Sequence, residues 1–175
     1  MASPRFVKQL NVQIGNEFAA HQQYVACAVY YDDQTMPQMA RFFYRQALEE
    51  RDHAMMMVQY LLDAEAEVAI PGVEAPKISF DNIVQPMELA LGQEKRVTEQ
   101  INQLTALARD DNDFASDQFM QWFIKEQVEE VATMSSLLAV VIRSKDDVES
   151  IEEWVAREAG GEDDDPTAPR VAGAE

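Results

Sequence analysis

Glu49-Glu50-Arg51-Asp52-His53 lies in the middle of a long segment whose pattern is otherwise that of a buried helix. Glu50 and His53 stand three residues apart, so on a helix their side chains leave the same face one turn from each other. The other residues on this face, at alternating spacings of four and three, are Met39, Phe43, Gln46, Met57 and Tyr60. A buried carboxylate without a partner costs several kcal/mol, so we expect a cation, most simply a metal ion, to meet this face.

Composition and charge narrow the class of protein. The chain has 175 residues, of which 47% are hydrophobic, so it is long enough to bury one sizeable core. Its longest apolar run, 137–142, is too short to cross a membrane, and its first residues lack a signal-peptide pattern. The single cysteine, Cys27, excludes an internal disulfide and fits a reducing, cytoplasmic location. A net charge of −18 disfavours nucleic acid and anionic membranes as partners, and it is compatible with attracting cations or with simple solubility.

Helix start and stop signals predict four long helices and one short one. Ser or Asp as an N-cap, Pro at a first helical position and Asp-rich turns mark the boundaries. In chain order these signals are Ser3-Pro4, the turn 32–35, Pro37, an end near 64–66, Pro86, the turn 110–113 with Asp113 as N-cap, a capping box over 144–147, and an end near 158.

The spacing of these signals predicts an all-α fold. A first helix of about 28–30 residues is very long for a globular protein and suits a bundle. The segment 68–83 holds Pro71-Gly72 and Pro76 and lacks helical periodicity, so we expect an extended connector. We predict one domain over 1–159, a four-helix bundle with a long crossover between its second and third helices and a short C-terminal fifth helix. The acidic stretch 160–175 is predicted to be a disordered tail.

Each long helix carries a glutamate where its apolar spacing predicts a core residue. Glu17 precedes the first turn by about as many residues as Glu50 follows it, which gives the two equal height in an antiparallel pair. Glu94 and Glu130 are placed in the same way about the second turn. Four carboxylates and His53 in one interior would either take up protons or hold cations. Oxygen-rich ligation with one imidazole favours iron or manganese, and Glu50 has the central place to bridge two metal ions.

Further polar residues lie near this set, and the residues alone leave their roles open. Glu49, Glu126 and Glu129 could form a third cation position or a solvated face. Gln127 and Tyr24 could hydrogen-bond the ligands or bound oxygen, and Tyr24 could equally be a core tyrosine with a satisfied hydroxyl.

His21 and a group of four aspartates each have a structural and a functional interpretation. His21 lies one turn after Glu17, and we expect it to support the site or the core rather than to bind metal. Four aspartates near the start of the fourth helix could line an entry path for cations or stabilise the helix N-terminus through its dipole. These are Asp110, Asp111, Asp113 and Asp117.

Over residues 4 to about 158 the chain resembles the ferritins. The motifs that carry the resemblance are Asn16-Glu17 with Tyr24, Glu49-Glu50-Arg51-Asp52-His53, Gln93-Glu94, and Glu126-Gln127-Val128-Glu129-Glu130. The resemblance implies a ferritin-like bundle that assembles into a hollow cage of twenty-four chains and stores a ferric oxide mineral. It also implies a ferroxidase centre inside each chain, at which Fe(II) is oxidised.

The same resemblance implies roles for individual residues. The ligands of one iron would be Glu17, Glu50 and His53, and those of the other would be Glu50, Glu94 and Glu130, with Gln127 and Tyr24 close by. A third iron position, usual in prokaryotic ferritins of this type, would correspond to Glu49, Glu126, Glu129 and Glu130.

Two departures favour a prokaryotic ferritin without haem. Bacterioferritins carry a second Glu-x-x-His on the fourth helix, whereas here Thr133 stands three residues after Glu130. Their haem-binding Met follows the first Glu of the second-helix motif, where this sequence has Arg51. We therefore expect iron and no haem.

Two other functions stay open beside this one. A di-iron oxygenase uses similar carboxylates, but it commonly has two Glu-x-x-His motifs and a larger chain with a substrate pocket. A non-catalytic acidic bundle acting as a scaffold would need none of the four in-stripe glutamates. We predict an iron-storage ferroxidase that forms a homo-oligomeric cage, takes Fe(II) and O2 or peroxide as substrates, and binds neither nucleic acid nor membrane.

Overall fold

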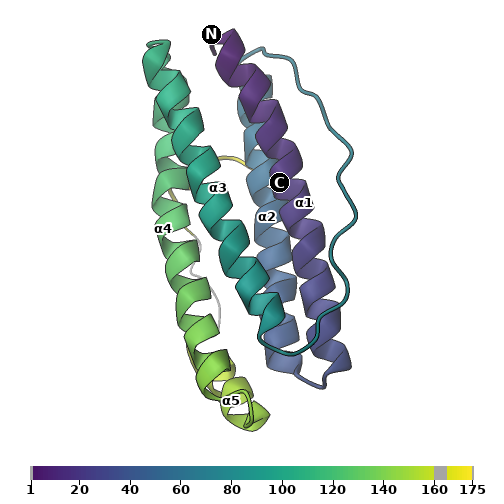
Figure 1. The fold of residues 1–175 in the computed structure, drawn as a ribbon. Coiled ribbons are helices and arrows are strands. Elements are labelled where there is room, and N and C mark those ends of the chain that lie inside the picture. The colour runs from purple at the N-terminus through teal and green to yellow at the C-terminus, as the bar shows by residue number, and fades with distance from the viewer. Residues whose placement is uncertain (1, 160–164, 175) are drawn as a thin grey trace.

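The computed structural model describes residues 2–159 and 165–174, and these ranges contain helices and no strand. The helices are α1 (Pro4–Asp33), α2 (Pro37–Asp63), α3 (Gln85–Asp110), α4 (Phe114–Arg143) and α5 (Val148–Glu158). α1 packs against α2 and α3 against α4, α1 also contacts α3, and α5 lies at one end of the bundle against α2 and α4 (Figure 1). The predicted all-α bundle with a short fifth helix is confirmed. None of the helices in the described ranges is long and apolar enough to span a membrane.

The first and fourth helices begin where the N-cap signals predicted. The hydroxyl of Ser3 accepts a hydrogen bond from the backbone N–H of Phe6 at 3.3 Å, and Pro4 occupies the first helical position. The carboxylate of Asp113 accepts from the N–H of Ser116 at 3.2 Å. Each side chain satisfies one of the donors that a helix N-terminus leaves without a partner in the helix.

Each of the first three helices is followed, two positions after its last residue, by a residue with a left-handed backbone. Thr35, Glu65 and Asn112 have φ angles of 59°, 54° and 54°. In the first turn the N–H of the next residue, Met36, donates to the carbonyl of Tyr31 at 2.9 Å, which closes the last turn of α1. These short closures fix the register of the two helical hairpins.

The fifth helix begins later than predicted. The stretch 144–147 was expected to open it as a capping box, but Ser144 is the C-cap of α4, and its N–H donates to the carbonyl of Val140 at 3.0 Å. The N-cap of α5 is Asp147, whose carboxylate accepts from the N–H of Ser150 at 3.2 Å. The serine of the predicted motif is therefore part of the preceding helix.

The connector between α2 and α3 runs along the outside of α1, as Figure 1 shows. Two amide side chains of α1 hold it. Asn11 accepts from the N–H of Ala69 at 2.6 Å and donates to the carbonyl of Glu67 at 2.9 Å. Gln23 makes the same pair of bonds with the N–H and carbonyl of Lys77, both at 2.9 Å. Side chains of the helix beneath thus satisfy backbone groups of the extended crossover at Glu67, Ala69 and Lys77.

Gly15 lies between Asn11 and Gln23 on α1, where Pro71 of the connector passes close to the helix. A Cβ atom at this position would lie 2.7 Å from Cγ of Pro71. Any larger residue would push the connector outward, so the absence of a side chain allows the close crossing.

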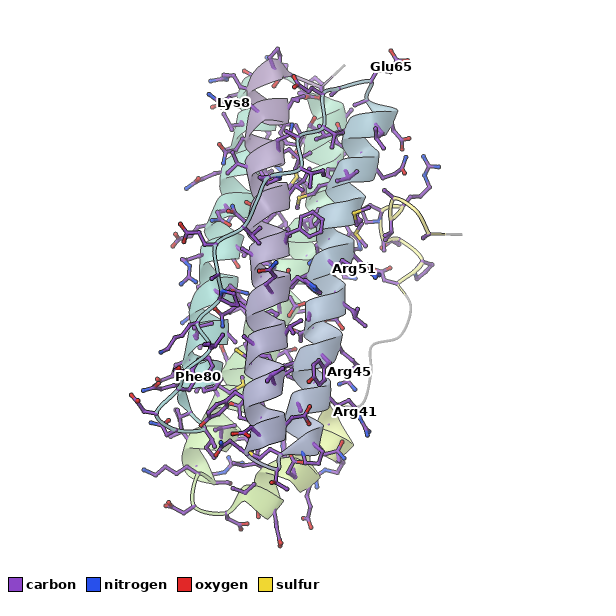
Figure 2. All side chains as sticks on the ribbon, turned by 90° about the vertical axis from the view of Figure 1, so that its right-hand side faces the viewer. Lys8, Arg41, Arg45, Arg51, Glu65 and Phe80 are labelled. Atoms are coloured by element: carbon purple, nitrogen blue, oxygen red, sulfur yellow. The ribbon has the colours of Figure 1, made fainter. Side chains whose placement is uncertain are left out.

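Part of the predicted tail lies against the bundle, beside α2 in Figure 2. The whole stretch 160–175 was expected to be disordered; residues 160–164 and 175 lie outside the described residues. Asp165 accepts from the indole N–H of Trp122 at 3.0 Å and from the Lys125 ammonium at 3.2 Å. Further along, the N–H of Ala172 donates to the carbonyl of Met55 at 3.2 Å. The partners of these described residues lie on α2 and α4, and local composition does not show them.

The core consists of two apolar clusters, one toward each end of the bundle. The lower cluster, near α5, includes Tyr31, Phe43 and Leu137, and the upper cluster includes Leu10, Leu61 and Leu104. Along each long helix the residues of one cluster are separated from those of the other by a short polar stretch. The four polar stretches meet as one layer, which holds the glutamates singled out from the sequence.

The fifth helix caps the second. The N-cap residue of α2, Met36, makes no side-chain hydrogen bond to the helix. Instead the carboxylate of Glu152 in α5 accepts from the N–H groups of Gln38 and Met39, at 2.7 Å and 3.0 Å. An anion at this position also interacts favourably with the helix dipole. Ile151 and Val155 bury the inner face of α5 against the lower cluster.

We predict that Glu152→Ala lowers the free energy of unfolding by about 1–2 kcal/mol, because it removes both bonds of the cap. Chemical denaturation of the metal-free protein, followed by circular dichroism, measures this change. Glu153→Ala is the matched control, since Glu153 is the exposed neighbour on the same helix. Equal stability of the two variants would show that the cap contributes nothing.

Candidate metal centre

Each long helix contributes one buried glutamate to the polar layer between the two clusters. Glu17, Glu50, Glu94 and Glu130 have relative exposures of 1%, 2%, 0% and 3%, and that of His53 is 5%. All five residues were predicted to meet in the core. Burial at this level removes nearly all hydration from the carboxylates, so their partners must come from the protein or from a ligand.

Three of these side chains approach closely enough to share one metal ion. Glu17, Glu50 and His53 each offer a ligand atom, and these atoms lie within 4.8 Å of one another. Nδ1 of His53 is 3.4 Å from Oε2 of Glu50, one turn earlier on α2. The imidazole packs edge-on against the rings of Trp122 and Phe123, with centroids 5.7 Å and 5.8 Å away. Arg51, one of the two residues between Glu50 and His53 in sequence, is exposed on α2 and is labelled in Figure 2.

Glu94 is held from two sides by neutral donors. The phenolic O–H of Tyr24 donates to one of its oxygens, and the amide of Gln127 donates to the other at 3.4 Å. Thr98 orients Gln127, because its hydroxyl lies 2.9 Å from the amide oxygen. Tyr24 and Gln127 therefore both donate hydrogen bonds to Glu94, a candidate metal ligand. The sequence pattern did not single out Thr98, although its spacing of four from Glu94 put it on the same face.

Glu17 has a comparable partner that was not predicted. The amide of Gln13, which is fully buried, donates to Oε1 of Glu17 at 2.8 Å. The spacing of four residues was again the available signal. Gln46, one turn before Glu50 on α2, was placed correctly in the buried stripe, and its amide donates to Glu49.

Burial dominates the electrostatics of the layer. It raises the pKa of Glu17 to about 7, and it raises that of Glu50 well above the usual value, with the charges of Glu94, Glu17 and Glu130 adding to the shift. Burial also raises the pKa of Glu94, although the hydrogen bond from Tyr24 opposes the shift. The pKa of His53 is lowered to about 4 for the same reason. Without a cation the layer favours protonated carboxyls and a neutral imidazole.

Glu50 occupies the middle of the layer. Its carboxyl interacts with that of Glu17 on one side and with that of Glu94 on the other, and the charge of Glu130 also acts on it. Glu50 thus interacts electrostatically with both halves of the predicted ligand set. Oxygen donors with a single imidazole are the ligands that iron and manganese accept, so the residues present fit such an ion.

The predicted third cation position is less enclosed. Glu49 and Glu126 are half-buried, whereas the side chain of Glu129 is 61% exposed and lies 3.8 Å from the ammonium of Lys125. His21 is also half-buried, with Nδ1 2.6 Å from the carbonyl of Ala47, and so links α1 to α2 at the edge of the layer.

The aspartates near the start of α4 have local partners. Asp113 caps the helix, and Asp111 accepts from the hydroxyl of Ser3 at 2.7 Å and from the guanidinium of Arg5. Asp117 lies 3.1 Å from the guanidinium of Arg109. These contacts agree with the structural interpretation, in which acidic groups stabilise this end of the bundle.

Comparison with known proteins gives an independent measure of what the chain is similar to. Residues 7–143 match the family model described as Ferritin, ferritin-like domain. Ferritin BfrB of Mycolicibacterium smegmatis is 51% identical over 169 residues, which are 97% of this chain and 93% of that protein. The bacterial non-heme ferritin of Staphylococcus aureus is 37% identical over 147 residues, 84% of this chain and 89% of that protein. The solved open pore ferritin of Archaeoglobus fulgidus has a TM-score of 0.86 at 27% identity, covering 90% of this chain and 99% of that one.

We predict that metal binding to this layer releases protons. At pH 6 the carboxyl of Glu17, with a pKa of about 7, holds a proton that a divalent ion must displace. The affinity for Zn(II) should therefore rise between about pH 5.5 and about pH 8. His53, with a pKa of about 4, is already neutral and releases none.

Isothermal titration of Zn(II) at pH 6 in two buffers of different ionisation enthalpy measures the proton release. Glu17→Gln should release fewer protons than the wild type, because an amide has none to lose. Identical heats in the two buffers would contradict the prediction.

Proposed function

We infer, on the premise that this chain belongs to the iron-storage ferritin family, that it oxidises Fe(II) to Fe(III) with O2 or peroxide and stores the product as a ferric oxide mineral. The oxidation takes place at a di-iron site inside each subunit, and the mineral collects in a cage of twenty-four chains. One observation carries this proposal. It is the group of Glu17, Glu50 and His53, whose ligand atoms lie within 4.8 Å of one another in a buried layer.

The two irons divide the layer between them. The first is bound by Glu17, Glu50 and His53, and the second by Glu50, Glu94 and Glu130. The contacts of Glu50 with both Glu17 and Glu94 support its role as the shared ligand. Tyr24 and Gln127, which donate to Glu94, keep that carboxylate oriented while iron binds and leaves.

The charge of the ligands favours the oxidised product. Each Fe(II) gives up one electron, and two of them reduce one O2 to peroxide, or one peroxide to water, with protons taken from solvent. Anionic oxygen ligands gain more from the higher charge of Fe(III) than from that of Fe(II), and the low polarity of the two flanking apolar clusters strengthens the effect. Protons displaced from Glu17 and its neighbours leave when Fe(II) enters.

A third iron position next to this pair would use Glu49, Glu126, Glu129 and Glu130. Glu130 is buried in the layer, and Glu49 and Glu126 are half-buried beside it. The exposed Glu129 makes this position the one open to solvent, which suits an ion in transit between the di-iron site and the mineral.

Assembly is supported by apolar side chains that a single chain leaves exposed. Val12 and Val29 of α1 and Ile70 and Ile78 of the connector, which runs along α1, are all exposed. Contacts between copies of the chain would remove these groups from water.

We predict that Glu50→Ala and His53→Ala each slow the oxidation of Fe(II) by at least about 10-fold, because each removes a ligand of the site. The rate is read from ferric absorbance after aerobic addition of Fe(II) to the metal-free protein. Glu129→Ala is the matched control. It should keep the first rapid oxidation and change only the oxygen consumed per iron. Wild-type rates in both Glu50→Ala and His53→Ala would rule the site out.

The assembly is predicted to have a mass near twenty-four times that of the 19.8 kDa chain. Size-exclusion chromatography with light scattering gives this mass directly. A monomer or dimer as the largest species would contradict the cage, and it would leave the oxidation assay as a separate test.

A further inference from the structure

Gln13 is a buried polar side chain next to the site, and both its amide nitrogen and its oxygen are hydrogen-bonded. It is fully buried on α1, one turn before Glu17. Its amide nitrogen donates to Oε1 of Glu17 at 2.8 Å and to the side-chain oxygen of Gln100 at 3.1 Å. Its own oxygen accepts from the amide of Asn16 at 3.0 Å. Both N–H donors and the acceptor are used, so the amide cannot turn over without losing all three bonds.

This arrangement leaves Glu17 with two unlike oxygens. Oε1 is held by Gln13, whereas Oε2 is buried and has no hydrogen-bond donor among the described residues. A buried acceptor without a donor is costly, and a cation is the partner that the nearby Glu50 and His53 would share. The bond from Gln13 thus determines which oxygen Glu17 offers to the ion.

A neutral donor suits this role better than a cationic one. Lysine or arginine at the position would pair with Glu17 and compete with the incoming metal ion. An amide fixes the direction of the carboxylate and leaves its charge available.

The amide of Gln13 is itself anchored from outside the layer. Asn16 on α1 and Gln100 on α3 are both half-buried, and both line a hollow of about 300 Å³ between α1, α3 and the connector. The chain of side chains from Asn16 and Gln100 through Gln13 to Glu17 therefore joins two helices to one candidate ligand.

We propose that Gln13 is a positioning residue, which acts through Glu17 to present one carboxylate oxygen to the first metal position. The proposal rests on the proposed function, because it assumes that Glu17 binds metal. A purely structural role for Gln13, tying α1 to α3, would instead affect stability and leave metal binding unchanged once the protein has folded.

Titration of Zn(II) into the assembled, metal-free protein tests this. Gln13→Leu keeps the size of the side chain and removes its donors, and it should weaken binding at the Glu17 position by about 10-fold to 100-fold. Binding at the position that uses Glu94 and Glu130 should not change. The absorption spectrum of bound Co(II) identifies which position is affected. Gln22→Leu, the same change at an exposed site of α1, should bind as the wild type does.

The double variant with Glu17→Gln separates positioning from general damage. If Gln13 acts through Glu17, Gln13→Leu should cause no further loss of affinity in that background. Should Gln13→Leu fail to assemble, Gln100→Leu keeps the bond to Glu17 but frees the other donor, and it should give a smaller loss at the same position.

Wild-type affinity in Gln13→Leu, or an equal loss in both backgrounds, would overturn the positioning role alone. A wild-type protein that binds no Zn(II) at Glu17 would overturn the proposed function, and the positioning role with it.

Discussion

Four carboxylates from four helices share one dry layer, and the rest of the fold makes this layer possible. Apolar clusters above and below exclude water, so the charged form of each glutamate is disfavoured, and the pKa values of Glu17, Glu50 and Glu94 rise. A metal ion supplies the charge that solvent would otherwise provide. Until it arrives, protons take its place. The same burial that makes the glutamates costly in the empty protein makes them strong ligands in the loaded one.

Neutral groups complete the layer. Gln13 donates to one oxygen of Glu17, whereas Tyr24 and Gln127 donate to the two oxygens of Glu94. Because none of the three carries a charge, they orient the glutamates without competing with the ion for them. In the proposed site the layer therefore has two kinds of polar residue, those that would bind the ion and those that hold the ligands in place.

How much of the fold and of the candidate site could be predicted from the sequence depended on how unusual each residue is at its position. A glutamate or histidine in an apolar helical stripe is unusual, so Glu17, Glu50, His53, Glu94 and Glu130 stood out, and proline and N-cap positions gave the helices. Gln13 and Thr98 did not stand out, because glutamine and threonine are common on solvated helix faces and so give no sign that they are buried. The prediction at Ser144 was wrong because a serine can be the N-cap of a following helix or, as here, the C-cap of the preceding one. The contacts of Asp165 with Trp122 and Lys125 form only in the packed bundle, so the composition around Asp165 could not predict them.

The bond from Glu152 to the start of α2 joins segments 114 residues apart. During synthesis the second helix therefore stays uncapped until Glu152 has left the ribosome, because the carboxylate of that residue completes the cap. Chain growth at about 5–20 residues per second sets that delay, for 114 residues, at roughly 6–23 s. The second helix thus reaches its final form only after α5 has emerged, so a segment made later determines the stability of one made earlier.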